Sequence, residues 1–287
     1  MTRVALIGLG EVGTVIAEEL RGLAISAWDV AFDDPHSAVS RRVETLDVAA
    51  CSNTVDAVRG ADLVISAVTA ANAVSAAVAA APGIDESAWF LDLNSSSPER
   101  KESAAIAIEQ AGGRYVEAAV MSPIEPKRLA APMLLGGPHA AVFAEFAAEL
   151  GFTGLEPYAE TIGLAAATKL CRSVVIKGLE ALLTESMLAA RSWGVEDRVL
   201  ESLSNLLPGD WHALAPYMIS RSLEHGTRRA EEMREAAMTV SGAGVTPTMS
   251  DAVALRQEWA AQHHKAAAAT ALGPMLDAME KGAGRAG

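Results

Sequence analysis

The chain has 287 residues, 51% of them hydrophobic, and a formal net charge of −13. This length is enough for two domains with sizeable cores. The negative charge argues against a nucleic-acid partner, because nucleic-acid binding needs a basic surface. Every apolar run is interrupted by polar residues before it reaches membrane-spanning length, so no membrane partner is expected. The two cysteines, Cys51 and Cys171, lack the spacing of a metal site.

The N-terminal residues combine a short apolar strand with a glycine-rich turn. The strand is expected at residues 3–7. It is followed by Gly8-Leu9-Gly10-Glu11-Val12-Gly13, which has the pattern G-x-G-x-x-G, and by a helix that runs to about Arg21. Strand, glycine loop and helix form the fingerprint of a dinucleotide site, with the phosphates at the helix N-terminus. We therefore expect this loop to bind a nicotinamide or flavin nucleotide; the alternative is a glycine-rich turn without a ligand.

The next strand, residues 24–28, ends in an acid, Asp29. An acid at this place accepts hydrogen bonds from the ribose hydroxyls and repels a 2′-phosphate, which favours NAD over NADP. An ordinary turn aspartate is the alternative. NADP also stays open, because Arg41 and Arg42 follow closely enough to form a phosphate pocket.

Alternating strands and helices continue to about residue 160. We expect strands at residues 43–46, 61–68, 89–92, 114–117 and 133–136, with a helix around residues 54–59. Strands separated by helices predict a doubly wound parallel sheet with right-handed crossovers. The fold class is therefore α/β, with an N-terminal NAD(P)-binding Rossmann domain at residues 1–160. The chain starts directly with the first strand, so we expect no signal peptide and a cytoplasmic location.

Helical patterns replace strand patterns in the second half. Residues 163–192 form one long helix-compatible run without proline, with apolar residues at helical spacing. Further helices are expected at residues 196–207, 211–239 and 249–272, before a glycine-rich tail at 281–287 that should fray. We expect an all-α domain at residues 161–287 for substrate binding and dimerisation. The long helix has more apolar surface than a small domain can cover, which predicts a homodimer.

Two polar segments follow predicted strands at residues 92–98 and 117–123. Ligands of open α/β sheets bind beyond the carboxyl ends of the strands. In the first segment, Asn94 and Ser95 can reach the nicotinamide ribose and a substrate carboxylate. The serines before Pro98 also have the composition of a helix N-cap, and both interpretations can hold together.

Lys169 lies in a stretch of small and apolar residues at the start of the long helix. Apolar surroundings lower the pKa of a lysine, which suits a general base or acid. The alternative is a lysine whose ammonium group extends to water. Ser173 is one turn further along. Lys177 is about 80° around the helix, where it is either a contact for an anionic substrate or a surface charge.

These segments, in this order and spacing, resemble the β-hydroxyacid dehydrogenase superfamily, which includes 6-phosphogluconate, 3-hydroxyisobutyrate and tartronate-semialdehyde-type enzymes. The resemblance covers nearly the whole chain. Residues 92–98 are similar to its D-x-S-T-x-x-P segment, and residues 117–123 to its D-A-P-V-S-G-G segment. Residues 163–173 are similar to its G-x-x-x-x-x-K-x-x-N-N segment, which places Lys169 on the catalytic lysine.

The chain departs from this family at two places. Met121-Ser122-Pro123 stands where the family has S-G-G, and Arg172 and Ser173 stand where it has two asparagines. The substrate pocket is therefore expected to differ from the common one. The V-M-S-P sequence and Lys177-Gly178-Leu179 look more like the 6-phosphogluconate-dehydrogenase-like branch that has a distinct, uncharacterised C-terminal domain.

The resemblance implies an NAD(P)-dependent oxidoreductase that transfers hydride between nicotinamide and a small hydroxy acid or sugar acid, with Lys169 as general acid/base. The implied cofactor-binding residues are Gly8, Leu9, Gly10, Glu11, Val12, Gly13, Asp29, Val68, Thr69 and Asn94. The implied substrate-binding residues are Ser95, Met121, Ser122, Pro123, Ser173 and Lys177. Two rivals stay open: an imine reductase, a group that typically lacks this lysine and prefers NADP, and a non-catalytic nucleotide-binding homologue, which the lost asparagines would favour.

A positive cluster spans residues 221–229. Second-domain helices of the resembling family close over the substrate, so His225 or Arg229 could bind an acid there. The alternative is a solvated helix face that pairs with Glu231, Glu232 and Glu235 at helical spacing.

Overall fold

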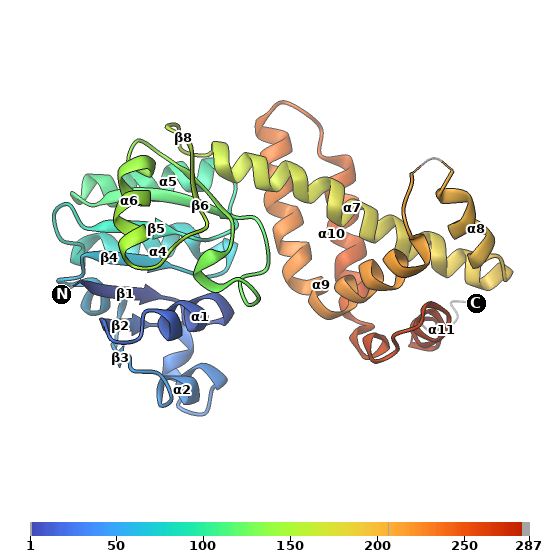
Figure 1. Cartoon of the computed structure of the whole chain (residues 1–287), viewed down its shortest axis with the longest axis horizontal. Coiled ribbons are helices and arrows are strands. Elements are labelled where there is room, and N and C mark those ends of the chain that lie inside the picture. Colours follow the sequence, from blue (N-terminus) through green and yellow to red (C-terminus); the bar gives the residue numbers. More distant parts are fainter. Residues whose placement is uncertain (1, 206, 283–287) are drawn as a thin grey trace. The chain divides into compact units, whose positions relative to one another are not determined.

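The computed structural model describes residues 2–205 and 207–282 (Figure 1). The chain separates into two compact units, Met1–Lys169 and Leu170–Gly287, called here the α/β unit and the helical unit. The division falls inside a long helix, after Lys169, and not at the expected residue 160. Residues 283–287 of the predicted fraying tail lie outside the described residues.

The α/β unit contains an eight-stranded sheet in the order β3-β2-β1-β4-β5-β6-β7-β8. The strands are β1 (Arg3–Ile7), β2 (Ala24–Trp28), β3 (Ala49–Ala50), β4 (Leu63–Ser66), β5 (Trp89–Asp92), β6 (Arg114–Val120), β7 (Met133–Gly136) and β8 (Leu155–Ala159). All neighbouring strands are parallel except β6 and β7, which are antiparallel. The expected α/β fold is confirmed, but the sheet is mostly and not wholly parallel.

Helices cover both faces of this sheet (Figure 1). They are α1 (Glu11–Glu19), α2 (Ala38–Val43), α3 (Thr54–Val58), α4 (Ala73–Ala80), α5 (Pro98–Gln110) and α6 (Ala140–Glu149), with short 3-10 helices at Val30–Asp33, Ala70–Asn72, Ala81–Gly83 and Arg128–Ala130. In β1, Val4 and Leu6 pack into a core shared with α1 and α6, while Ala5 and Ile7 pack into one shared with α3, α4 and α5. Burial on both faces explains why the inner strand β4 is almost continuously apolar.

Two details of the sheet differ from the prediction. The strand expected at residues 43–46 is wrong, because these residues form the end of α2 and the turn after it. The Ser37 side chain accepts a hydrogen bond from the backbone N–H of Ser40 (2.9 Å), and this cap starts a helix in which Val43 is the last residue. The edge strand β8 has no counterpart in the prediction. It is largely exposed and contains Pro157, which lacks the N–H of a ladder and is tolerated at a sheet edge.

The helical unit contains most of α7 (Leu164–Trp193), followed by α8 (Glu196–Leu203), α9 (Trp211–Gly242), α10 (Thr248–Ala261), a 3-10 helix (His264–Ala268) and α11 (Leu272–Gly282). No strand occurs among its described residues. The single helix expected at 249–272 is wrong, since α10 ends at Ala261. The backbone there changes to the tighter 3-10 pattern, in which each N–H bonds to the carbonyl three residues earlier. The N–H of Gln262 donates to the Trp259 carbonyl, and the N–H of His263 donates to the Ala260 carbonyl. Among the described residues, no helix has the length and apolar character that a membrane span needs.

Candidate active site

The glycine loop joins β1 to α1, and steric crowding requires glycine at two of its three glycine positions. Gly8 has φ +93°, and a Cβ there would lie 2.4 Å from the carbonyl oxygen of Ala67. A Cβ on Gly13 would lie 2.1 Å from the carbonyl oxygen of Gly8, so this glycine lets the helix pack against the turn. A Cβ on Gly10 would meet nothing within 4 Å. The open side of the loop is therefore at Gly10, where a pyrophosphate would approach.

The first turn of α1 fits a phosphate ligand. Gly10 is its N-cap residue and provides no side-chain hydrogen bond to the helix. The first helical bond of the segment runs from Thr14 N–H to the Gly10 carbonyl (3.0 Å), so the N–H groups of Glu11, Val12 and Gly13 have no intrahelical acceptor. Such N–H groups, together with the positive end of the helix dipole, favour an anion.

Asp29 and Arg42 hold the same loop residue, Leu9, from two sides. Asp29 Oδ2 accepts the N–H of Leu9 (2.7 Å), and Oδ1 accepts the N–H of Ala31 (2.8 Å). Arg42 donates to the Leu9 carbonyl (3.2 Å) and to Thr14 Oγ1 (3.1 Å). Each Asp29 oxygen keeps capacity for a second hydrogen bond, so a ribose can still be bound. The sequence suggested Arg42 only as a possible phosphate ligand and gave no signal for its contact with the loop.

The ends of β4 and β5 lie beside the glycine loop. Val68 is next to Gly8: a Cβ on Gly8 would lie 3.1 Å from Cγ1 of Val68. The N–H of Val68 donates to Asn94 Oδ1 (2.7 Å), and Asn94 Nδ2 donates to Ser66 Oγ (3.0 Å). Asn94 is buried and thus ties the two strand ends together. Thr69 is exposed and accepts a hydrogen bond from Asn72 Nδ2 (3.0 Å).

Lys169 meets the segment that follows β5. Its Nζ donates to Ser95 Oγ at 2.6 Å, and both side chains are half-buried. Ser95 lies three residues after the end of β5, on the carboxyl edge where the glycine loop also lies. The structure therefore brings together the glycine loop, the segment after β5 and the start of α7, and Glu117, the first residue of the segment 117–123, also contacts α7. Ser97 and Pro98 also occupy the N-cap and first positions of α5, as the helix-cap interpretation expected, although the Ser97 side chain makes no capping hydrogen bond to the helix.

A buried ionic group lies beneath this segment. Asp92, at the end of β5, accepts hydrogen bonds from Asn94 N–H (2.8 Å) and the Tyr115 hydroxyl (2.7 Å). Lys101 Nζ lies 2.9 Å from Asp92 Oδ1 and also donates to the Asp92 carbonyl (3.0 Å). Burial, and then the negative charge of Asp92, raise the pKa of Tyr115 well above its ordinary value. The sequence could have flagged Asp92, since an acid that ends an apolar strand needs buried partners.

Glu117, at the matching place in β6, holds the start of α7. Its Oε1 accepts the N–H groups of Gly163 (2.9 Å) and Ala165 (3.1 Å). Burial raises the pKa of Glu117, although Lys101 and these two N–H groups act in the opposite direction. The sequence resemblance aligned Glu117 with a family acid but predicted no role for it.

The other expected substrate segment, residues 121–123, follows β6. The backbone N–H of Met121 donates to the Pro132 carbonyl (2.8 Å), and Ser122 Oγ donates to the Pro123 carbonyl (3.2 Å). Met121 and Ser122 are half-buried, and Pro123 is exposed. These residues follow the carboxyl end of β6, at the edge of the sheet where the glycine loop lies. Their binding to a substrate stays a prediction.

Ser173 and Lys177 belong to the helical unit and have partners there. Lys177 Nζ donates to Ser173 Oγ (3.3 Å) and forms an ion pair with Glu232. The Lys177 side chain is only 9% exposed, so the surface-charge alternative is wrong. Substrate binding by Ser173 and Lys177 stays a prediction, and a substrate at Lys177 would have to compete with Glu232.

The positive cluster at 221–229 is not simply a solvated face. Arg229 forms a buried ion pair with Glu180 of α7 rather than with the acids that follow it on α9. Arg228 pairs as the helical spacing predicted, with Glu232 at 3.6 Å. Burial, followed by Arg221, lowers the pKa of His225. The prediction failed for Arg229 because a partner on another helix cannot be read from spacing within α9.

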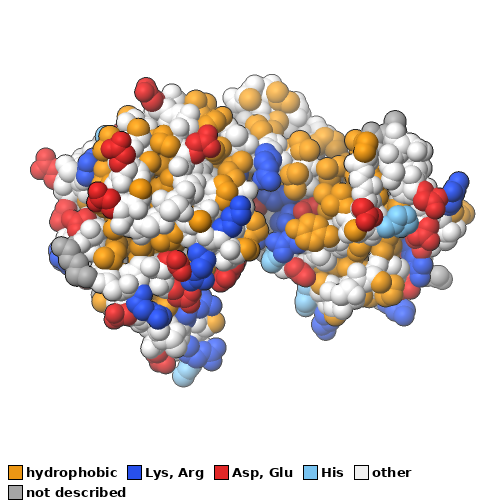
Figure 2. All heavy atoms as spheres, viewed as in Figure 1, with side chains coloured by type: hydrophobic (Ala, Val, Ile, Leu, Met, Phe, Trp, Pro, Cys, Tyr) orange, Lys and Arg blue, Asp and Glu red, His pale blue; other side chains and the backbone are white. Residues whose placement is uncertain are grey.

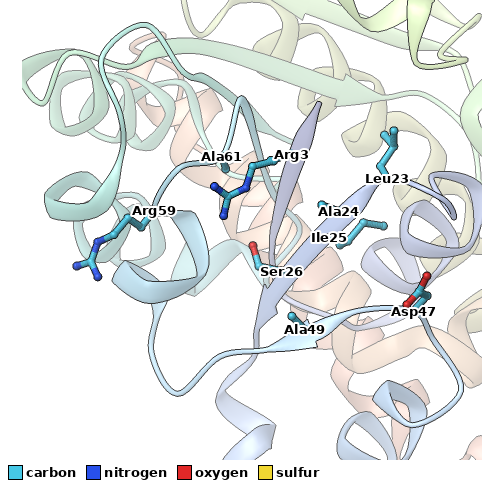
Figure 3. Close-up of a pocket in the computed structure, with 9 residues that line it drawn as sticks. All are labelled: Arg3, Leu23, Ala24, Ile25, Ser26, Asp47, Ala49, Arg59 and Ala61. Atoms are coloured by element: carbon cyan, nitrogen blue, oxygen red, sulfur yellow. The ribbon is translucent and has the colours of Figure 1, made fainter. Parts of the chain in front are cut away.

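A cavity of about 370 Å³ lies at the other edge of the sheet (Figure 3). Its lining includes Arg3 and Ala24, the first residues of β1 and β2, so it is at the amino ends of these strands. Arg3, Arg59 and Asp47 on its rim are exposed. The glycine loop follows the carboxyl end of β1, and this cavity is therefore separate from the candidate active site.

The chain also matches known families. Residues 3–150, just over half of the chain, match the NAD binding domain of 6-phosphogluconate dehydrogenase. The chain belongs to this NAD-binding family. Residues 190–260 match a domain of unknown function, DUF1932. The family resemblance and the NAD(P) cofactor expected from the motifs are thereby confirmed.

Solved structures extend the likeness over nearly the whole chain. A conserved hypothetical protein from Sinorhizobium meliloti is 36% identical, with a TM-score of 0.77 and coverage of 98% of this chain and 97% of that chain. A conserved protein of unknown function, described as similar to 3-hydroxyacid dehydrogenases, is 30% identical, with a TM-score of 0.68 and coverage of 90% and 97%. The 3-hydroxyisobutyrate dehydrogenase of Mycobacterium tuberculosis is 18% identical, with a TM-score of 0.73 and coverage of 98% and 99%; it shares the fold.

Proposed function

We propose that this protein is an NAD(P)-dependent oxidoreductase for a small hydroxy acid or sugar acid, with Lys169 as the general acid/base. The observation that carries the proposal is the 2.6 Å contact between Lys169 Nζ and Ser95 Oγ at the carboxyl edge of the sheet. The glycine loop lies on the same edge, joined to Ser95 through Val68 and Asn94. A lysine held beside a hydroxyl group there is placed to exchange a proton with a substrate hydroxyl.

The residues divide the work as follows. The N–H groups at the start of α1 bind the pyrophosphate, and Asp29 binds the adenosine ribose, which favours NAD. Bound nicotinamide would supply the hydride acceptor or donor. Lys169 takes the hydroxyl proton during oxidation and returns it during reduction. Ser95 and Ser122 hold the anionic substrate by hydrogen bonds.

An absorbance assay for nicotinamide reduction or oxidation tests this function. The native protein, Lys169→Ala and an exposed-lysine control, Lys127→Ala, are each assayed with both cofactors. NAD and NADP are supplied with hydroxy acids and sugar acids for oxidation, and their reduced forms with cyclic imines for reduction. We expect turnover of an acid with the native protein and the control, and a loss of about 100-fold or more in Lys169→Ala.

Other outcomes overturn parts of the proposal. Imine reduction that survives in Lys169→Ala would assign the protein to the imine reductases. NAD(P) binding without turnover of any compound would favour a non-catalytic homologue. Acid turnover that is equal in Lys169→Ala and the control would reject Lys169 as the acid/base.

We also propose that the protein is a homodimer. Val175, Leu182 and Trp193 lie on one stripe of α7 and are 61%, 56% and 82% exposed. Figure 2 shows hydrophobic side chains over much of the visible face of the helical unit. An apolar area of this kind marks an interaction surface in a water-soluble enzyme. Light scattering at micromolar concentration should give the mass of a dimer; a monomer mass would reject the proposal.

A further inference from the structure

The carboxylate of Glu117 attaches the start of α7 to the sheet, and a hydrogen bond between the hydroxyl groups of Tyr158 in β8 and Thr168 in α7 (3.0 Å) adds a second contact. Glu117 Oε1 accepts the N–H groups of Gly163 and Ala165, at 2.9 and 3.1 Å, and these are among the helix N-terminal donors that lack an intrahelical acceptor. Glu117 is fully buried, as are Gly163 and Ala165. Lys169 lies on the same helix, four residues after Ala165, so this attachment is one turn from the lysine.

The space for this carboxylate is built into the sheet. Gly136 of β7 is directly opposite Glu117 in the antiparallel pair, and a Cβ on Gly136 would lie 2.2 Å from Glu117 Oε1. Gly163 has φ +95°, and a Cβ there would lie 3.0 Å from Cβ of Pro98, the first residue of α5. The two glycines therefore let the Glu117 side chain and the first turn of α7 come together.

Ser95, whose hydroxyl group contacts Lys169, is positioned by a second carboxylate, that of Asp92. Asp92 is paired in register with Glu117 on the neighbouring parallel strand, so both side chains leave the same face of the sheet. Asp92 binds the N–H of Asn94, the residue before Ser95. Burial raises the pKa of Glu117, and the charge of Lys101, which is bonded to Asp92, opposes this rise. Asp92 thus fixes the strand end that carries Ser95, while Glu117 fixes the helix that carries Lys169.

We propose that Glu117 is a positioning residue that holds α7 so that Lys169 Nζ meets Ser95 Oγ. The inference rests on the proposed function only for the statement that this contact serves proton transfer. The position of Lys169 can be measured without any substrate, so the two can fail separately.

The acceptor atom, and not the negative charge, is what this role needs. Glu117→Gln keeps an oxygen at the end of a side chain of the same length, and so keeps both hydrogen bonds to α7. Glu117→Ala removes the acceptor and leaves two buried N–H groups without a partner. If Glu117 acted only through its negative charge, both Glu117→Gln and Glu117→Ala would lose the effect.

The test reads the Nζ resonance of Lys169 in a nitrogen NMR spectrum of isotope-labelled lysine, assigned with Lys169→Arg. Ser95→Ala should shift this resonance by removing its partner. Glu117→Ala should shift it in the same direction, and Glu117→Gln should leave it near the native position. In Glu117→Ala, the further shift caused by Ser95→Ala should disappear, because the contact is already lost.

Asn53→Ala is the matched control, since Asn53 caps α3 in the same unit by accepting the N–H of Asp56 (2.9 Å). It should leave the Lys169 resonance unchanged. An unchanged resonance in a folded Glu117→Ala protein would overturn the proposal. So would additive shifts from Glu117→Ala and Ser95→Ala, because the two residues would then act independently.

Activity gives a second measurement once a substrate is known. Glu117→Ala should lower kcat by about 100-fold with KM unchanged, because a small misplacement of a reacting group has that effect. Glu117→Gln should restore kcat. Rescue of the Lys169 resonance by glutamine without turnover in any protein would uphold the positioning role and reject the proposed function. Turnover that is abolished by Lys169→Ala but unaffected by Glu117→Ala would do the reverse.

Discussion

The two units use buried charges in different ways. In the α/β unit, Asp92 and Lys101 form an ion pair, but they and Glu117 also bind backbone groups: the N–H of Asn94, the Asp92 carbonyl, and the first N–H groups of α7. In the helical unit, buried charges pair with each other, Lys177 with Glu232 and Glu180 with Arg229.

This difference teaches what each charge is needed for. A charge that binds backbone groups fixes the path of a loop or a helix end, and its removal leaves buried polar groups unsatisfied. Replacing both members of a buried ion pair by apolar residues of similar size leaves no buried charge uncompensated and therefore costs little stability. The α/β unit should therefore tolerate such replacement poorly and the helical unit well.

The largest effect is expected for Asp92. Asp92→Ala leaves Lys101, Tyr115 and the N–H of Asn94 without their acceptor and should lower the free energy of unfolding by about 4 kcal/mol. The double variant Asp92→Leu/Lys101→Met should stay at least about 2 kcal/mol less stable than the native protein, since the backbone N–H and the tyrosine hydroxyl remain unsatisfied. Urea unfolding followed by circular dichroism measures both. Native stability in the double variant would contradict the comparison.

Arg229 should respond differently. Arg229→Ala leaves Glu180 buried without its main partner and should cost about 3 kcal/mol. The double variant Glu180→Leu/Arg229→Met should recover to within about 1 kcal/mol of the native protein in the same urea experiment. Arg229 Nε already lacks a partner among the described residues, so the native pair is not fully satisfied. A double variant no more stable than Arg229→Ala would show that this pair also supports groups beyond itself.

Gly136 in the α/β unit and Gly226 in the helical unit allow the two units to be compared by steric effects without a change of charge. Gly136→Ala and Gly226→Ala should each cost about 1–3 kcal/mol, because a Cβ would lie 2.2 Å from Glu117 Oε1 and 2.4 Å from the Gln257 carbonyl oxygen. Only Gly136→Ala should also shift the Lys169 resonance. Thermal unfolding together with the nitrogen spectrum separates the two effects. A shift caused by Gly226→Ala would mean that Lys169 responds to general loss of stability.

The smallest effect is a dependence on pH. Burial raises the pKa of Glu117 and of Glu180 above the ordinary 4.5, so the folded state binds more protons than the unfolded state between the two values. The native protein should therefore lose stability as pH rises through the folded pKa. Glu117→Gln removes this loss, and its stability advantage should vanish below the ordinary value.

Glu180→Gln is the matched comparison in urea unfolding across pH. It should gain less than Glu117→Gln because it leaves the buried Arg229 charge without its acid. A Glu117→Gln advantage that grows as pH falls would contradict the direction of the pKa shift.

Local sequence patterns predicted the elements correctly where a residue's burial follows from its own type and its immediate neighbours. The apolar runs of β5 and β7 were predicted at their observed bounds, and so was the glycine loop, because there is no room for a Cβ at Gly8 or Gly13. Residues 43–46 misled the prediction since the Ser37 cap outweighed their β-branched side chains. The antiparallel direction of β7 has no local signature, because burial on both faces looks the same in either direction.

The site was predictable in part for a similar reason. Motif spacing placed Lys169 and Ser95 in segments that proved to meet. Asp92 at the end of an apolar strand could have been recognised as an acid that needs buried partners, but the sequence did not identify those partners. Lys101 lies on a helix with no marked apolar stripe, and its partner Asp92 is on another element. Lys177 failed as a surface charge because Glu232 is distant in sequence. Contacts between elements decide such residues, and helical spacing cannot supply them.

The pairing of Gly136 with Glu117 also limits how relatives can diverge. Any side chain at position 136 would occupy the place of the Glu117 carboxylate. Relatives that keep an acid at position 117 should therefore keep glycine at 136, whereas relatives with a small residue at 117 are free to vary there. The two positions should change together during evolution, and such covariation would identify which homologues anchor the start of α7 in this way.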